Sequence, residues 1–352
     1  MRLVSIALFV AGAVLLLSGV ALTFWLGLTT MPSYLADWLF WSSLPLGALP
    51  VVMLLDLAGP GAGFGLEPVL RRMLLLMPIA ALLMIPILLR PGDLFGWAMG
   101  HGFSAPFGKA WMNHGAFIGR SVAYFVIWFV LALLFLAPPS PETLYRRRGM
   151  AAAGLFVYAL SITLASVDWA MTTETDWFSP EYGLLFASAQ ATIAMCFAVL
   201  VSGDWRRIFP EPAAAFILVG AVAWVFMQFI QYLVIWSADK PSDITFYLHR
   251  WNLGSQVVVW IAFFGALVVP LFLLQAPRFR RHPRVIPAMA LLVLCVQTLG
   301  MLWLVTPSLR HDFTVSGMDA LELLGLGGVT LGLCLWPGML PKPSVEVSPH
   351  GG

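Results

Sequence analysis

Charged residues are scarce in this chain of 352 residues: they make up 10% of it, where a typical soluble domain has about 25%. Hydrophobic residues make up 60%, which is more apolar side chain than one soluble core can hide. The bilayer is therefore the expected solvent. The net charge is only +2, and there is no basic domain and no base-reading motif, which excludes a nucleic-acid-binding protein.

Cysteine and histidine are also rare. The three cysteines, Cys196, Cys295 and Cys334, stand far apart in apolar runs without a CxxC pair, which excludes a disulfide framework and an iron–sulfur cluster. The six histidines all fall in expected loops or tails, whereas haem ligation in a helical bundle needs histidines that project inward from facing helices. We expect no haem, no covalently bound cofactor and no metal ion.

Long apolar runs are what the chain has instead. A hydrocarbon core of about 30 Å needs roughly 20 apolar residues per helix. Ten segments meet this requirement: 3–28, 36–57, 70–89, 116–137, 150–171, 183–202, 213–236, 254–275, 285–305 and 317–337. Pro78 and Pro86 interrupt the third. A signal peptide cleaved near Ala21 is the alternative for the first, although its apolar run exceeds an ordinary h-region.

We therefore predict an all-α polytopic membrane protein with a single transmembrane domain over residues 1–340. A disordered cytoplasmic tail, rich in proline, serine and glycine, is expected over residues 341–352. With the even-numbered loops and both termini on one side, that side carries 13 of the 19 basic residues. The positive-inside rule then places both termini in the cytoplasm.

The most informative segment is Ser166–Tyr182. It places Asp168 and Trp169 inside the outer end of the fifth span, with Glu174 and Asp176 shortly after. An unpaired acid at the mouth of a hydrophobic segment costs about 2–3 kcal/mol or more, so such residues mark places where protons, ions or polar substrates are handled. The alternative is that these acids are ordinary solvated loop residues.

A second group of residues begins the fourth span. Asn113, Phe117, Arg120, Tyr124 and Trp128 recur every three or four residues, so they share one helical face. Arg120 lies a little inside the span and needs an acidic partner, for which the outer end of the fifth span offers Asp168. The alternative is an interfacial aromatic belt with a snorkelling arginine.

A third group follows the seventh span. Gln228 and Gln231 sit one turn apart within it, and Asp239 follows in the outer loop. Pro241 ends the span, and Ser242-Asp243 is expected to begin an outer amphipathic helix, after which Arg250 follows. The glutamines either hydrogen-bond neighbouring helices together or form a polar track inward from the Asp239 loop.

These residues resemble a family pattern. The fifth-span block Asp168-Trp169-x-Met171, with Trp177-Phe178-Ser179 and Tyr182, resembles a signature of the membrane subunits of alternative complex III. The same holds for Lys109, Asn113, Phe117, Arg120, Tyr124-Phe125 and Trp128, and for Gln231, Trp236-Ser237, Pro241, Tyr247-Leu248 and Arg250. The best match is the F-type subunit, a relative of the polysulfide-reductase (NrfD-like) anchors. The chain departs from the pattern at Thr175, where the family has proline, and it is shorter than typical members.

The resemblance implies two four-helix bundles with two peripheral helices, in the inner membrane of a bacterium. It implies a respiratory quinol:cytochrome c or quinol:acceptor oxidoreductase. The partners would be a sister ten-helix subunit and subunits that carry haem c and iron–sulfur clusters, with lipids around them. In the family the sister subunit is the better-supported quinol site, and the F-type subunit holds no redox cofactor.

The leading hypothesis is therefore a cofactor-free, non-catalytic subunit that takes part in proton conduction or quinol-site formation, with quinol as the substrate. Its outer polar cluster would combine Asp168, Arg120, Asp239 and Arg250. Trp169, Tyr124 and Trp128 would line the site. One rival is an ion- or proton-coupled transporter that uses the same acids. The other is a structural anchor for a periplasmic redox subunit.

Overall fold

The structure is a computed structural model. It describes residues 2–26, 30–59, 62, 65–100, 110–140, 142–174, 177–202, 210–282, 284–310 and 312–336. These residues form helices and connecting turns, with no strand among them. The predicted tail and the candidate Asp176 lie outside the described residues.

Ten helical segments of the described chain are long and apolar enough to cross a membrane, which confirms the predicted number. Their starts and ends differ from the predicted ones by only a few residues. Seven are single α-helices: α1 (Arg2–Leu26), α2 (Met31–Ala58), α7 (His114–Phe135), α9 (Tyr182–Val201), α10 (Pro210–Ala238), α15 (Val285–Arg310) and α16 (Gly317–Cys334). The fifth span, α8 (Leu144–Trp169), runs on into the short helix η4 (Met171–Thr173).

Two spans are interrupted. The third consists of α3 (Glu67–Met73), η1 (Leu74–Leu76), α4 (Met77–Leu83) and α5 (Ile85–Leu89). Its breaks follow from its prolines, which cannot donate a backbone hydrogen bond. The eighth span in chain order consists of α12 (Leu253–Ala262), a π-helical turn η5 (Phe263–Val268) and α13 (Val269–Gln275). Short helices connect the spans: η2 (Pro91–Asp93), η3 (Gly96–Met99), α11 (Pro241–Leu248) and α14 (Pro277–Arg280).

Side chains of α2 satisfy the backbone groups that the broken third span leaves open. The hydroxyl of Tyr34 donates to the carbonyl of Leu83 at 2.6 Å, and the indole of Trp38 donates to the carbonyl of Ala80 at 3.0 Å. Within a bilayer an open carbonyl is costly because no water is there to pair with it. The break is therefore tolerated because α2 lies against it.

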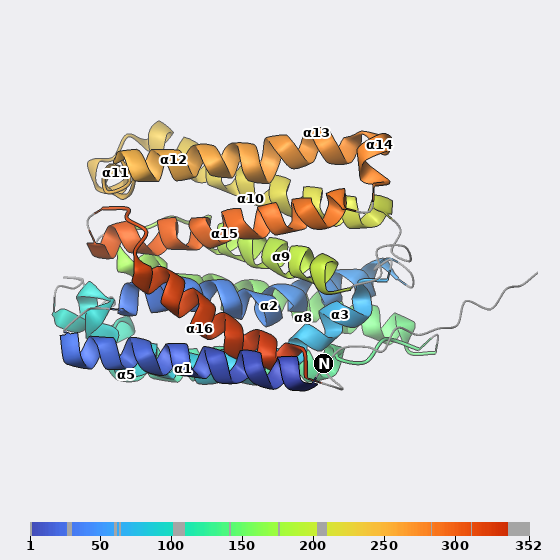
Figure 1. The fold of residues 1–352 in the computed structure, drawn as a ribbon, viewed down its shortest axis with the longest axis horizontal. Helices are drawn as coiled ribbons and strands as arrows, with labels where there is room; N and C mark the ends of the chain where they lie inside the picture. The colour runs from blue at the N-terminus through green and yellow to red at the C-terminus, as the bar shows by residue number, and fades with distance from the viewer. Residues whose placement is uncertain are drawn as a thin grey trace, which may run out of the picture.

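The helices are arranged as two bundles with one peripheral pair (Figure 1). The first bundle contains α2, the broken third span, α7 and α8, and the second contains α9, α10, the α12–α13 span and α15. Helices α2 and α9 join the two bundles, and α15 packs against both. The α1–α16 pair lies on the outside and contacts the rest mainly where α16 meets α2. The arrangement agrees with the predicted fold class.

Candidate functional site

A buried ion pair joins α7 to α8. Nε of Arg120 donates to Oδ2 of Asp168 at 2.8 Å, and Nη2 donates to Oδ1 at 2.9 Å. The Asp168 side chain is fully buried, while that of Arg120 is 15% exposed. The pairing predicted from the sequence is therefore present. The two-point geometry is the strong form of an arginine–carboxylate contact.

Two further donors complete the shell of Asp168. The hydroxyl of Tyr124 donates to Oδ2 at 2.9 Å, and the indole of Trp111 donates to Oδ1 at 3.3 Å. Arg120 also donates to the carbonyl of Trp111 at 2.6 Å, and its guanidinium lies over the Trp111 ring at 4.3 Å. We name Asp168, Arg120, Tyr124 and Trp111 the Asp168 centre. Trp111 was not among the residues predicted from the sequence.

Asn113 has a local role at this centre. Its side chain accepts a hydrogen bond from the backbone nitrogen of Ala116 at 2.9 Å, which caps the first turn of α7. Such a cap fixes where the helix begins and therefore where its later residues point. Asn113 is exposed, and its side chain bonds to the backbone of Ala110 and Ala116, so it positions the helix that carries Arg120.

The predicted lining residues fall into two groups. Tyr124 touches the carboxylate, whereas Trp169 and Trp128 form the core beside it. The indole of Trp169 donates to Ser121 at 3.1 Å, and that of Trp128 donates to Ser161 at 2.8 Å. The two tryptophan rings lie edge to face at 5.6 Å. Both side chains are fully buried, so they belong to the core that packs beside the Asp168 centre.

An apolar groove of about 420 Å³ lies between the broken third span and α7. It opens on the outside of the bundle, where Ile85, Val122 and Val126 are about half exposed. Ser121 lies in its wall and accepts the hydrogen bond from Trp169, the residue after Asp168. One serine and one tryptophan therefore connect this groove to the Asp168 centre.

A second polar centre forms around Glu174. Nη1 of Arg250 lies 3.2 Å from Oε2 of Glu174, and Ser308 donates to the same oxygen at 2.6 Å. Nδ1 of His249 lies 2.6 Å from Oε1. Glu174 and Arg250 are buried, whereas the His249 side chain is 44% exposed. This Glu174 centre therefore connects a buried carboxylate to a surface imidazole.

Arg250 also serves the backbone of α15. Pro307 lies inside that helix and has no backbone N–H, so the carbonyl of Trp303, four residues earlier, has no helical donor. Nε of Arg250 donates to that carbonyl at 3.2 Å, and Nη2 donates to the carbonyl of Leu304 at 2.8 Å. Burial lowers the pKa of the Arg250 guanidinium from its ordinary value, while Glu174 opposes this shift.

The sequence predicted one outer cluster, whereas the structure has two, the Asp168 centre and the Glu174 centre. Arg250 pairs with Glu174, six residues beyond Asp168 in the chain. Asp239 belongs to neither centre: it is exposed at the end of α10, where its φ of +48° lies in the left-handed region. The predicted outer helix after Pro241 is present as α11. Gln231 is buried in α10 and Gln228 half-buried, and their polar track stays a prediction.

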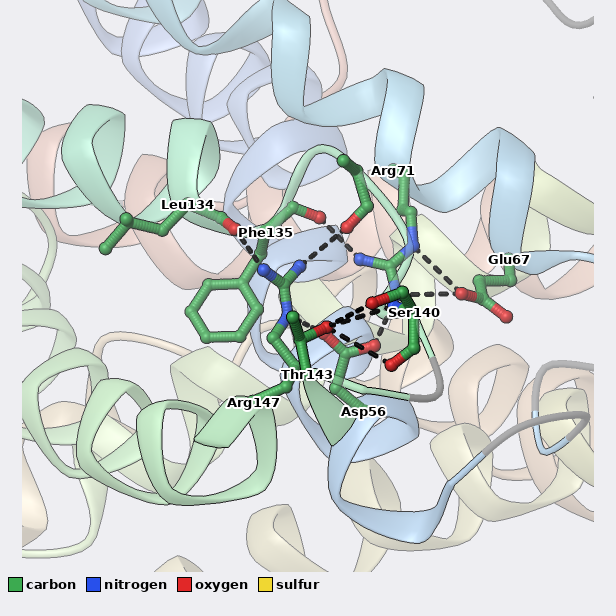
Figure 2. A network of polar contacts seen from close by, with 9 residues as sticks. Asp56, Glu67, Arg71, Leu134, Phe135, Ser140, Thr143 and Arg147 are labelled. Carbon is green, nitrogen blue, oxygen red and sulfur yellow. Dashed lines mark hydrogen bonds and ion pairs between the residues drawn. The ribbon is translucent and has the colours of Figure 1, made fainter. Parts of the chain in front are cut away.

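At the opposite end of the spans lies a third network, drawn in Figure 2. Asp56 accepts from both Arg71 and Arg147, and Arg71 also pairs with Glu67 at 2.7 Å. The two arginines donate to the last carbonyls of α7, those of Leu134 and Phe135. This arrangement ties α2, α3 and α8 to the end of α7.

Several of these residues had no chemical role in the sequence analysis. Arg71 and Arg147 entered it only through the count of basic residues, although Pro138 and Pro139, which follow α7, leave the carbonyls of Leu134 and Phe135 without helical donors. His249 directly precedes Arg250, but nothing local shows that it reaches Glu174. Ser308 lies over 130 residues away in sequence from Glu174, so no local pattern could have found it.

In comparisons with known proteins, no protein-family model and no curated protein matches this chain. The likeness to alternative complex III subunits therefore stays a prediction that rests on the motifs of α7, α8 and α10–α11.

Proposed function

We propose that this chain is a membrane subunit of a bacterial respiratory quinol-oxidising complex, and that its Asp168 centre takes part in quinol proton transfer. One observation carries the proposal. A buried carboxylate with its own arginine is connected, through Trp169 and Ser121, to an apolar groove on the outside of the bundle. A quinol has the matching chemistry, because its apolar tail suits such a groove and its hydroxyl must lose a proton on oxidation.

In this proposal Asp168 accepts the proton directly or through Tyr124, which bonds to it at 2.9 Å. Arg120 fixes the orientation of the carboxylate through a two-point contact. The chain itself supplies no redox cofactor. Electrons would pass to haem c or iron–sulfur subunits bound to it in the inner membrane.

The first test is purification of the native assembly in mild detergent through a tag on this chain, followed by a haem spectrum of the eluate. Co-purifying haem c and iron–sulfur subunits support the proposal. A solitary, colourless chain that takes up ions or solutes in liposomes supports the transporter instead and contradicts the proposal.

The second test is Asp168→Asn in that assembly, with the exposed Asp239→Asn as the matched control. We expect quinol oxidation to fall at least tenfold with the subunits still assembled, because the amide no longer accepts the proton. Tyr124→Phe keeps the ion pair and removes one hydrogen bond, so it should give a smaller loss. Wild-type oxidation in Asp168→Asn would refute the proton role.

A structural anchor is the second candidate function. The observation that favours it is the full hydrogen bonding of Asp168, whose two oxygens both receive donors from α7 and the segment before it. A purely structural pair predicts that Asp168→Asn destabilises the chain or the assembly, and that any assembled fraction oxidises quinol at the wild-type rate per complex.

A further inference from the structure

Three acidic side chains are buried where the peripheral α1–α16 pair meets α2. Asp37 of α2 is 1% exposed, and Asp319 and Glu322 of α16 are each 2% exposed. Asp37 and Glu322 lie more than one turn past the first residues of their helices, roughly 9 Å along the axis in the case of Asp37, and Asp319 lies in the first turn of α16. The site is separate from the Asp168 and Glu174 centres.

Among the described residues, one base contacts this group of acids, and it contacts Asp319. Arg310, at the end of α15, reaches Asp319 with Nη2 at 2.8 Å and Nη1 at 3.2 Å. Asp319 also accepts from the backbone nitrogen of Ser316 at 2.6 Å, in the capping box that begins α16. The single positive charge is therefore engaged by Asp319, whose oxygens are fully used.

Among the described residues, no base contacts Asp37 or Glu322. The charged groups that act on Asp37 are Asp319, Glu322 and Arg310. Thr30 provides a hydroxyl to Glu322. In the described part of α1 the charged residue is Arg2, 17 positions before Gly19 and roughly 25 Å away along the helix. With every acid ionised the group would carry a net charge of −2.

Each of these two acids also has an oxygen with no donor. Oδ2 of Asp37 and Oε2 of Glu322 are buried and lack a hydrogen-bond partner among the described residues. The backbone of α1 closes over the second acid, since a side-chain carbon placed on Gly19 would lie 2.5 Å from Oε1 of Glu322. A buried carboxylate with an open oxygen and no cation is among the most costly groups in a membrane protein.

We propose that Asp37 and Glu322 form a proton-binding site that holds at least one proton at neutral pH. A proton removes one negative charge and turns an open oxygen into a hydroxyl donor, with no need for further ligands. Ca²⁺ or Mg²⁺ needs about six or more oxygens around it, more than the open oxygens here supply. The site is independent of quinol chemistry and stands whether or not the Asp168 proposal holds.

The test is infrared difference spectroscopy of the purified full chain in detergent micelles between pH 5 and pH 10. Protonated carboxyl groups have a distinct C=O stretch that shifts in D₂O. We expect wild type to show this signal at pH 7 and to lose it at high pH. The double variant Asp37→Asn/Glu322→Gln should lose the signal, and Asp239→Asn should keep it.

Stability provides a second readout. An acid that is already neutral loses no charge on becoming an amide, so the double variant should unfold at pH 7 within a few degrees of wild type. Asp319→Asn, which breaks an ion pair in the same place, should unfold at a clearly lower temperature. The proposal would be overturned if the double variant misfolded while the Asp319→Asn variant stayed folded.

Two spectroscopic outcomes would also overturn it. One is a pH 7 spectrum without a protonated carboxyl signal, or a signal unchanged in the double variant. The other is a signal that appears only when sodium chloride is replaced by choline chloride at fixed pH, which would mean that a sodium ion occupies the site in place of the proton.

Discussion

At the scale of single residues, two buried arginines and the half-buried Arg147 lie where prolines leave carbonyls without donors. Pro307 frees the carbonyl of Trp303, which Arg250 reaches. Pro138 and Pro139 follow α7 and free the carbonyls of Leu134 and Phe135, which Arg147 and Arg71 reach. An arginine has five donors, so one side chain can serve a carboxylate and two carbonyls at once. Hydrogen bonds to backbone carbonyls therefore hold these arginines in place, in addition to their ion pairs.

Arg250→Met tests this dual role. It leaves Glu174 buried without its base and two carbonyls open, and we expect the unfolding free energy to fall by about 3–5 kcal/mol. Adding Pro307→Ala restores a backbone donor to Trp303, so the double variant should regain about 1 kcal/mol. Unfolding by denaturant in mixed micelles measures both, with the exposed Lys240→Met as control. Strictly additive losses would contradict the backbone role.

Asp56 and Glu67 belong to the same network, drawn in Figure 2, but differ in burial. The Asp56 side chain is 2% exposed and serves two arginines, whereas Glu67 is 26% exposed and serves one. We expect Asp56→Asn to cost about 3 kcal/mol, because two buried cations lose their partner. Glu67→Gln should cost under about 1 kcal/mol, as partly exposed pairs do. The same denaturant titration decides, and equal losses would be the contrary result.

At the scale of helices, close packing depends on glycines. Helix α2 touches α9 at Gly47, where a side-chain carbon would lie 1.9 Å from the carbonyl oxygen of Gln190. Helix α1 touches α16 at Gly12, where the same carbon would lie 2.5 Å from the backbone nitrogen of Val329. Small residues let the backbones of membrane helices approach closely. Van der Waals contact then holds the helices together, because the hydrophobic effect does not drive their association within lipid.

Gly47→Ala should therefore destabilise the junction of the two bundles. The added methyl group has no space, and overpacking of this kind costs about 1–3 kcal/mol. Gly119→Ala on the exposed face of α7 is the matched control, since nothing lies within 4 Å of its added carbon. Alanine is the better helix former, so this control should be neutral or slightly stabilising. Thermal unfolding in micelles compares the two, and similar midpoints would argue against the contact.

At the scale of the whole molecule, charge divides the two membrane faces. The even-numbered loops carry most arginines, and the odd-numbered loops carry the Asp168 and Glu174 centres. Because basic residues are retained on the cytoplasmic side, this division predicts that both centres face outward. A quinol oxidised there would release its protons on the outer side.

Cysteine labelling tests the orientation. In a background with the three native cysteines replaced by serine, Lys240→Cys and Glu142→Cys place single thiols at exposed positions on opposite sides. We expect a membrane-impermeant maleimide to label Lys240→Cys in intact cells and Glu142→Cys only after permeabilisation. The reverse pattern would invert the topology and place both centres in the cytoplasm.

The ten spans, their approximate ends, their predicted orientation and the Arg120–Asp168 pair all follow from the amino-acid sequence. These features depend on local hydrophobicity, on charge count and on two helices joined by one short loop, so each can be read within a few dozen residues. The broken third span was also foreseeable, because proline acts on its own turn.

The pairing of charges that are distant in the chain depends on the packing of the helices. It brought Glu174 to Arg250 and Ser308, joined Asp56 to Arg147, and left Asp239 exposed. It also buried Asp37 beside Glu322, which are nearly 300 residues apart in the chain. Helix order in a bundle is set by packing between faces, where almost every face is equally apolar in sequence. The neighbour of a buried acid is therefore a property of the assembled bundle.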